Sequence, residues 1–296
     1  MLFERQRRLL TLLDALGGSV GFVDFQKLLF LFCQEPAAGH PYDFVPYKFG
    51  PFSFTSYADR RKLVERGLLA DDEGEWRLTD AGRKVIGGTQ DFQLAAFTRR
   101  WRGTRGDALV AETYRRFPYY AIRSEIAARI LRSDTAALDR IEAARPAAKV
   151  ATVSTIGYEG RTLESYLNEL LHAGVTLLCD VRRNPISRKY GFSKNTLAKG
   201  CEGVGIRYEH LPELGIASDQ RQSLETQADY DALFARYERK SLPLQAQALA
   251  TIQEWVRAGA SVALTCYERL PQQCHRHCVA EAMERRVGNG LEAQHL

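Results

Sequence analysis

Strand-like runs that alternate with amphipathic segments limit the fold of this chain more than any other feature, and they begin near residue 150. The strand-like runs cover 150–156, 175–181, 206–210 and 261–266. Apolar residues at helical spacing cover 163–171, 230–255 with an interruption at Pro243, and a segment from about 273. Such alternation is typical of a parallel sheet with helices on both faces. We therefore predict a three-layer α/β domain with a mostly parallel sheet at 149–296.

Residues 1–88 have a different pattern, in which helices precede a hairpin. Leucines at helical spacing between Leu9 and Leu16 indicate one helix, Asp24 can cap a second, and 56–67 forms a third. The phrase ERGLLADDEGEWRLTDAG at 65–82 then indicates a β-hairpin and the start of another helix. This order resembles the winged helix-turn-helix group. The resemblance implies an α+β domain at 1–88 that contacts nucleic acid, or alternatively a scaffold or dimerisation module.

A protein partner stays open because the segment YKFGPFS at 47–53 is similar to antitoxin-type winged helices that act through protein contacts.

Residues 89–148 are predicted to form a basic helical connector that ends in a linker around Pro146. Residues 1–149 hold 24 Lys and Arg against 19 Asp and Glu, whereas 150–296 hold 17 of each, so the whole excess of +5 lies in the first half. A run of arginines can neutralise the phosphates of a nucleic acid. The alternative is that these arginines only cover a helix face in contact with water. We predict that DNA or RNA binds here through Arg99, Arg100, Arg102 and Arg105.

Several classes of protein are not expected. Runs of about 18 apolar residues and a signal-peptide cleavage site are both missing, which predicts a cytoplasmic protein with no membrane partner. Six cysteines are too few and too unevenly spread for a disulfide scaffold. Neither a Walker loop nor a G-x-G-x-x-G fingerprint is present, so we expect no nucleotide cofactor.

Polar residues follow each predicted strand of the α/β domain. Because parallel strands end at one edge of the sheet, these residues are predicted to share a ligand site. Basic residues after the second strand favour a small anionic ligand, with surface solvation as the alternative. The predicted ligand or phosphate contacts are Tyr158, Arg182, Arg188, Lys194, His210 and Arg276.

The segment from Cys266 to Cys278 concentrates the reactive side chains. We predict that Cys274, His275 and Arg276 lie in the first turn of a helix, where the thiol ionises easily. Zinc is not expected, although Cys266, Cys274, His275, His277 and Cys278 offer ligands, because adjacent residues of a helical turn point in different directions. The predicted catalytic set is Asp180, Glu268, Cys274, His275 and Cys266. Buried, unreactive cysteines remain the alternative.

Three phrases, STIGYEGRTLESYLNELLHAGVTLLCDVRRNPISRKYGFSK, YEHLPELG and CYERLPQQCHR, resemble the domain-of-unknown-function-488 family over about 150–290. The resemblance implies a Rossmann-like α/β domain and supplies no reaction. It also implies a characteristic residue set at Gly157, Tyr158, Gly160, Asp180, Arg182, Pro185, Ser187, Lys194, His210, Leu214, Gly215, Cys266, Glu268, Cys274, His275 and Arg276. His277 and Cys278 fall outside it.

These features favour an enzyme that cleaves or modifies a base, sugar or phosphodiester of nucleic acid, as in DNA repair, modification or phage defence. The first domain would hold the polymer and the α/β domain would carry the chemistry. The alternative is a non-enzymatic regulator, in which the α/β domain senses a small anionic ligand and the winged helix binds DNA or protein. A homodimer is compatible with both interpretations.

Overall fold

The computed structural model describes residues 2–35, 39–87, 92–147, 151–221, 224–288 and 292–296. The chain divides into two compact units, Met1–Arg145 and Pro146–Leu296, which we call unit 1 and unit 2. Within the described ranges, no helix combines the length and the apolar character needed to cross a membrane.

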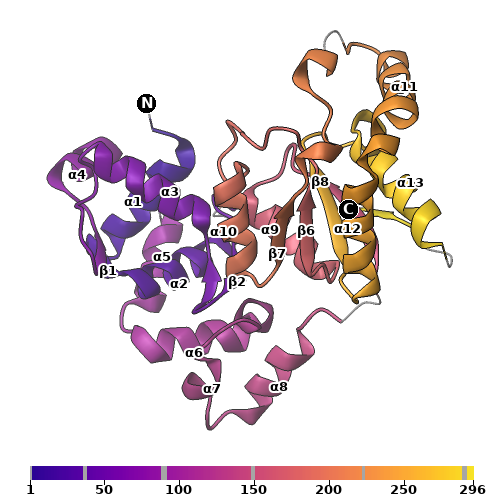
Figure 1. The fold of residues 1–296 in the computed structure, drawn as a ribbon. Helices are drawn as coiled ribbons and strands as arrows, with labels where there is room; N and C mark the ends of the chain where they lie inside the picture. The colour runs from indigo at the N-terminus through magenta and orange to yellow at the C-terminus, as the bar shows by residue number, and fades with distance from the viewer. Residues whose placement is uncertain (1, 36–38, 88–91, 148–150, 222–223, 289–291) are drawn as a thin grey trace. The chain divides into compact units, whose positions relative to one another are not determined.

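Unit 1 begins with helices and two small antiparallel sheets (Figure 1). Its first elements are α1 (Glu4–Ala15), β1 (Ser19–Gly21), α2 (Phe22–Cys33), β2 (Val45–Tyr47), β3 (Gly50–Phe52), α3 (Phe54–Glu65), β4 (Glu75–Arg77) and α4 (Asp80–Ile86). β2 pairs with β3, and β4 pairs with β1. The predicted hairpin over 68–79 is therefore only partly formed: its arms share the single bridge between Leu69 and Leu78, because the other strand partner of β4 comes from earlier in the chain.

The predicted connector packs against the core of unit 1. It contains α5 (Phe92–Trp101), α6 (Gly106–Arg116), the 3-10 turn η2 (Pro118–Ala121), α7 (Ala127–Ile130) and α8 (Thr135–Ala143). Leu94, Phe97, Trp101 and Leu109 belong to the same buried cluster as the leucines of α1. Residues 92–145 thus form one compact unit with the preceding elements, and the division at Arg145 lies three residues before the predicted boundary.

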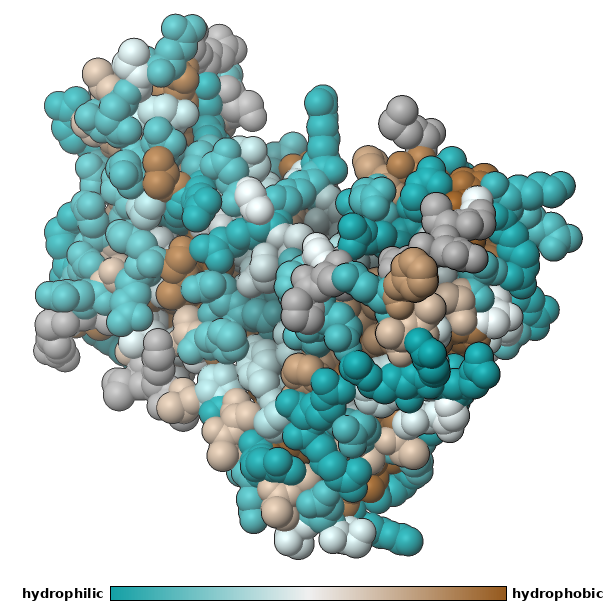
Figure 2. Space-filling view, turned by 180° about the vertical axis from the view of Figure 1, so that it is seen from behind, coloured by the Kyte–Doolittle hydropathy of each residue, from teal (hydrophilic) through white to brown (hydrophobic). Residues whose placement is uncertain are grey.

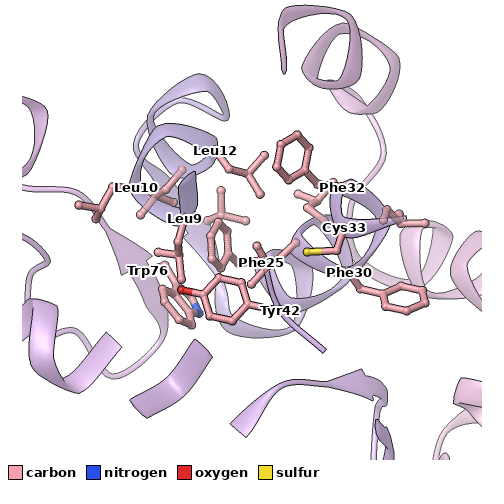
Figure 3. Close-up of a cluster of buried hydrophobic side chains, with 14 of the residues drawn as sticks. Leu9, Leu10, Leu12, Phe25, Phe30, Phe32, Cys33, Tyr42 and Trp76 are labelled. Carbon is pink, nitrogen blue, oxygen red and sulfur yellow. The ribbon is translucent and has the colours of Figure 1, made fainter. Parts of the chain in front are cut away.

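The centre of unit 1 is aromatic (Figure 3). The rings of Phe25 and Trp76 lie 4.6 Å apart between centroids, and both side chains are fully buried with Leu9 and Leu10. Trp76 comes from β4 and Phe25 from α2, so burial of these rings holds the small sheet against the helix.

Unit 2 is an α/β unit with a parallel sheet, which confirms the predicted class. Its order is β5 (Val153–Gly157), α9 (Leu163–His172), β6 (Leu177–Asp180), α10 (Lys194–Gly203), β7 (Arg207–His210), the 3-10 turns η3 (Pro212–Leu214) and η4 (Ser218–Arg221), α11 (Gln227–Arg236), the π turn η5 (Tyr237–Ser241), η6 (Leu242–Gln245), α12 (Ala246–Arg257), β8 (Val262–Cys266), η7 (Pro271–Gln273), α13 (Arg276–Val287) and β9 (Gln294–His295). The strands lie in the order β7-β6-β8-β5-β9, and every pair is parallel. The two-residue strand β9 was not predicted.

Helices cover both faces of this sheet, with α9 and α10 on one side and α12 and α13 on the other (Figure 1). Successive residues of a strand point to opposite faces. Cys179 and Cys266 join the apolar cluster that contains α12 and α13. Thr265 points the other way, since its hydroxyl accepts a hydrogen bond of 2.7 Å from Tyr166 of α9. Asp180 is the register partner of Thr265 and shares its face.

Hydrophilic residues cover most of the face shown in Figure 2, and apolar residues appear there only in small areas between them. Such scattered apolar residues are normal for a protein surface in contact with water.

Candidate functional site

A polar cavity of about 340 Å³ lies in unit 2 beyond the carboxyl ends of β5, β6 and β8. Its lining comes from the loops that follow these strands and from two segments after β7. The lining residues are Tyr158, Arg182, Arg183, Asn184, Ile186, Ser187, Arg188, Ile216, Arg221, Cys266, Tyr267, Glu268 and His275. Six residues of the predicted site are therefore brought to one cavity: Tyr158, Arg182, Arg188, Cys266, Glu268 and His275.

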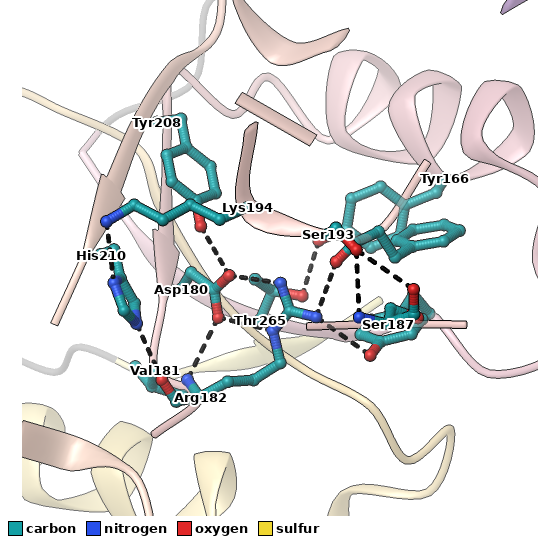
Figure 4. Close-up of polar contacts among 12 residues, drawn as sticks. Tyr166, Asp180, Val181, Arg182, Ser187, Ser193, Lys194, Tyr208, His210 and Thr265 are labelled. Atoms are coloured by element: carbon teal, nitrogen blue, oxygen red, sulfur yellow. Dashed lines mark hydrogen bonds and ion pairs between the residues drawn. The ribbon is translucent and has the colours of Figure 1, made fainter. Parts of the chain in front are cut away.

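Asp180, in contrast, is occupied by a buried ion pair with Arg182 (Figure 4). Its carboxylate accepts from Nε of Arg182 at 2.8 Å, from Nη2 at 2.5 Å, and from the Arg182 backbone N–H at 3.1 Å. The hydroxyl of Tyr208 donates a further bond of 2.7 Å. Asp180 is fully buried and does not line the cavity, so we leave it out of the proposed catalytic set.

Arg182 is held on its other side as well. Its Nη1 donates to the Tyr158 hydroxyl at 3.0 Å and to the Phe192 carbonyl at 2.8 Å. Burial alone would lower the pKa of Arg182, but the hydrogen bonds and charge of Asp180 raise it above its ordinary value. Most of its donors are thus committed within the protein, and its main effect is to position the loop after β6.

Lys194 and His210 lie next to each other, outside the cavity lining (Figure 4). Lys194 Nζ is 3.2 Å from Nδ1 of His210, whose Nε2 lies 2.9 Å from the carbonyl oxygen of Arg182. A neutral imidazole that donates from Nε2 to this carbonyl accepts from the lysine at Nδ1. These two residues therefore hold the Arg182 backbone through its carbonyl oxygen, and they lie outside the cavity lining.

The segment around Cys274 differs from the helical turn that we predicted. Pro271–Gln273 forms a 3-10 turn, Cys274 is extended with φ −139° and ψ 127°, and α13 begins at Arg276 with His275 as its N-cap. Cys274 is fully buried, and burial, followed by a hydrogen bond with Cys266, raises the pKa of its thiol well above the ordinary value. The prediction of an easily ionised thiol was wrong, because desolvation outweighs the effect of the helix terminus.

The extended backbone brings Cys266, Cys274 and His275 together. The Sγ atoms of both cysteines and one ring nitrogen of His275 all lie within 4.8 Å of one another, and the three residues are buried. His275 Nε2 lies 3.0 Å from the carbonyl oxygen of Val181, to which it can only donate. In the neutral ring Nδ1 then carries the lone pair, and it lies 3.8 Å from Sγ of Cys266.

Glu268 approaches this group from the loop after β8. Its Oε2 is 3.6 Å from Sγ of Cys266, and its Oε1 forms an ion pair with Arg221. Burial alone would raise the pKa of Glu268, but Arg221 and the hydrogen bond with Cys274 bring it below the ordinary value. Sequence reasoning did not find Arg221, because this arginine lies in a loop between strand and helix where no local motif indicates a contact with Glu268.

Arg276 shapes the site without lining it. Its Nη1 and Nη2 donate to the carbonyl oxygens of Glu268 and Arg269 at 2.5 and 3.0 Å, and the residue is fully buried. The same loop passes so close to Gly157 that a Cβ atom there would overlap the Glu268 carbonyl. Arg276, predicted as a ligand contact, instead fixes the loop that carries Glu268.

In unit 1 the four predicted nucleic-acid contacts differ in environment. Arg99 and Arg102 are exposed, whereas Arg100 pairs with Glu35 at 2.9 Å. Arg105 is half-buried, and its Nη1 donates to the carbonyl oxygens of Trp101 and Thr104 at 2.7 and 2.8 Å. Arg99 and Arg102 are therefore best placed to meet an external phosphate.

Residues 162–283 match the model of the family described as "Domain of unknown function DUF488". No curated protein matches the chain. The matched range contains most of the cavity lining, including Arg182, Cys266, Glu268 and His275, while Tyr158 lies just before it. Unit 2 of this chain therefore carries a domain of the DUF488 family.

Proposed function

We propose that this protein is an enzyme that cleaves or modifies a nucleic acid or a nucleotide-derived group at the cavity of unit 2. The observation that carries the proposal is the shared lining: a thiol, a carboxylate and an imidazole from Cys266, Glu268 and His275 face the same 340 Å³ space as Arg183 and Arg188. Acid–base groups next to guanidinium groups suit reactions of anionic substrates.

The choice of an anionic substrate depends on the arginines at the rim. Arg183 and Arg188 are exposed, and planar guanidinium groups bind phosphate through two parallel hydrogen bonds. Arg182 is largely committed to Asp180, so it offers few new bonds to a ligand and the ion pair cancels most of its positive charge. A cavity of this size fits one nucleotide-sized group and excludes a folded polymer.

Unit 1 would hold the rest of the nucleic acid. The order of helices and small strands in residues 4–86 supports a winged-helix interpretation, and Arg99 and Arg102 add exposed positive charge. Phosphate contacts of this kind position a polymer without reading its sequence. The proposal thus assigns binding to unit 1 and chemistry to unit 2.

The test is a mass-spectrometric assay on short oligonucleotides, incubated as single-stranded DNA, duplex DNA and RNA with the full chain. Base loss, strand scission and deamination each change the mass differently, so one assay separates the reactions. We expect a change with the wild type that Glu268→Gln abolishes and that Arg188→Ala reduces. Arg257→Ala, an exposed arginine at the end of α12, is the control and should retain full turnover. The absence of any mass change with all three substrates would contradict the proposal.

The second candidate is the non-enzymatic regulator, in which the α/β unit senses a small anionic ligand and unit 1 binds DNA or protein. A second cavity favours it, because residues 47–52 of the segment that leaves a protein partner open belong to its lining. It measures about 320 Å³, lies in unit 1, and is lined by aromatic residues of 47–52 and by Lys27. Lys27 is buried, and desolvation lowers the pKa of its amine to about 7. If the oligonucleotides bind without any change in mass, this regulator function becomes the better interpretation.

A further inference from the structure

We infer that Cys266, Cys274 and His275 form a zinc site whose remaining coordination position faces the cavity of unit 2. Two thiolates and one imidazole are a known catalytic zinc ligand set, and zinc prefers such sulfur and nitrogen donors. The sequence argued against zinc because helical neighbours diverge. The extended backbone at Cys274 removes that objection.

The donor atoms are already close enough for coordination. Ligand atoms of a tetrahedral zinc site lie roughly 3.3 to 3.8 Å apart, as follows from Zn–S and Zn–N bonds of about 2.3 and 2.0 Å. Here the three donors lie within 4.8 Å of one another, and Cys266 Sγ is 3.8 Å from Nδ1 of His275. Small rotations about the χ angles, which move the donor atoms by about 1 Å, would close the remaining gap.

The surroundings of His275 also match those of a metal ligand. Its Nε2–H is directed at the carbonyl oxygen of Val181 at 3.0 Å, which fixes the ring and leaves Nδ1 for the ion. A hydrogen bond of this kind, from the ring nitrogen that does not bind the metal to a backbone carbonyl or a carboxylate, accompanies nearly every zinc-bound histidine. Neighbouring His277 and Cys278 do not join the group: Nδ1 of His277 lies 2.7 Å from the Cys274 carbonyl oxygen.

The position of the three residues decides where substrate would meet the ion. Cys266 and His275 line the cavity, whereas fully buried Cys274 lies behind them. Three protein ligands leave one tetrahedral position for water, which is typical of catalytic sites. Glu268, paired with Arg221, sits beside Cys266 as a non-ligand carboxylate that can carry a proton.

This role in catalysis rests on the proposed function, whereas the metal site itself does not. A zinc-bound water would pass one proton to Glu268 and add as hydroxide to an electrophilic carbon or phosphorus of the substrate. The bond to the leaving group breaks, and that group takes the proton back from Glu268. The balance is one water consumed, so the reaction class would be hydrolysis, which includes deamination of a base.

The test measures metal directly. We expect elemental analysis of the full chain, purified without chelator, to give about one zinc per chain. After removal of zinc and addition of Co²⁺, the wild type should show the visible bands of tetrahedral cobalt together with a near-ultraviolet thiolate-to-cobalt band. Protein without bound zinc, and without these bands on cobalt addition, would overturn the inference.

Matched variants identify the ligands. Cys266→Ser and Cys274→Ser should lose the zinc and the thiolate band, whereas Cys278→Ser, a buried cysteine four residues further on, should retain both. Loss in the Cys278 variant with retention in the other two would refute the ligand set. If the ligand variants do not fold, the cobalt spectrum of the wild type still decides, because the thiolate band requires cysteine ligands.

Glu268→Gln separates the inference from the proposed function. Because Glu268 is not a zinc ligand, the variant protein should keep one equivalent of zinc while it loses turnover. Zinc with no turnover on any oligonucleotide leaves the metal site standing and removes the proposed function. Turnover by protein that holds no zinc would refute the metal site and leave the proposed function standing.

Discussion

At the scale of single residues, the partner of a charged side chain decides its role more than its place in a motif does. Asp180 and Arg182 both follow a buried strand, where ligand contacts are expected. Yet they form a buried pair whose hydrogen-bonding groups are nearly all used within unit 2. The charge that remains for a ligand lies on Arg183 and Arg188, which are exposed.

Arg182→Ala is expected to destabilise unit 2. It leaves the Asp180 carboxylate buried and without its ion-pair partner, a change that typically costs about 3–5 kcal/mol. Urea unfolding followed by circular dichroism measures the loss. The control Arg188→Ala, at an exposed arginine, should stay within about 0.5 kcal/mol of the wild type. The two variants therefore separate stability from ligand binding, and equal stabilities for both would show that the buried pair contributes nothing.

At the scale of elements, the site depends on how the loop after β8 lies against β5. The backbone N–H groups of Tyr158 and Glu159 donate to the carbonyl oxygens of Cys266 and Tyr267 at 3.3 and 2.9 Å. This pairing continues past the strand ends and brings Gly157 against the Glu268 carbonyl. Glycine is required there because the neighbour is backbone, which cannot rotate away as a side chain can.

Gly157→Ala should displace the loop that carries Glu268 and cost about 1–3 kcal/mol, the usual range for overpacking. Thermal unfolding gives the stability, and the zinc content reports on the position of Cys266. Gly200→Ala is the matched control, because a Cβ atom at this buried glycine of α10 meets only side-chain carbons at 3.4 Å or more. A melting temperature of the Gly157 variant equal to that of the wild type would contradict the close approach.

At the scale of the whole molecule, charge is divided unequally along the chain. The excess of +5 lies in residues 1–149, while 150–296 is balanced. Under the proposed function, the first part binds the polyanion electrostatically and the neutral second part acts on a single group of it.

Binding of a labelled DNA duplex to the full chain should weaken steeply as salt increases, because bound phosphates release counterions. Reversal of two exposed arginines, Arg99→Glu with Arg102→Glu, should lower affinity on unrelated sequences and reduce the salt slope by about 2. Fluorescence anisotropy at several salt concentrations measures both quantities. Arg257→Glu in α12 should leave the slope unchanged, and a slope near zero for the wild type would remove nucleic acid as the ligand of unit 1.

The sequence by itself determined the class of unit 2 and the edge at which its site would form. Apolar runs and helical spacing predict a parallel sheet, and parallel strands end at a common edge, so Tyr158, Arg182, Cys266 and Glu268 could be assigned to one region. These are properties of period and order along the chain, which need no knowledge of side-chain contacts.

Only the tertiary structure decided which polar residues meet. Asp180 and Cys266 both end strands, but strand alternation directs them to opposite faces of the sheet, where Arg182 neutralises one and His275 meets the other. Cys274 reaches Cys266 because its own backbone is extended just before the N-cap of α13. The extended and helical conformations of one residue differ little in local energy, so the sequence does not decide between them. Arg221 pairs with Glu268 from 47 residues away, and such a contact is set by packing of the folded chain.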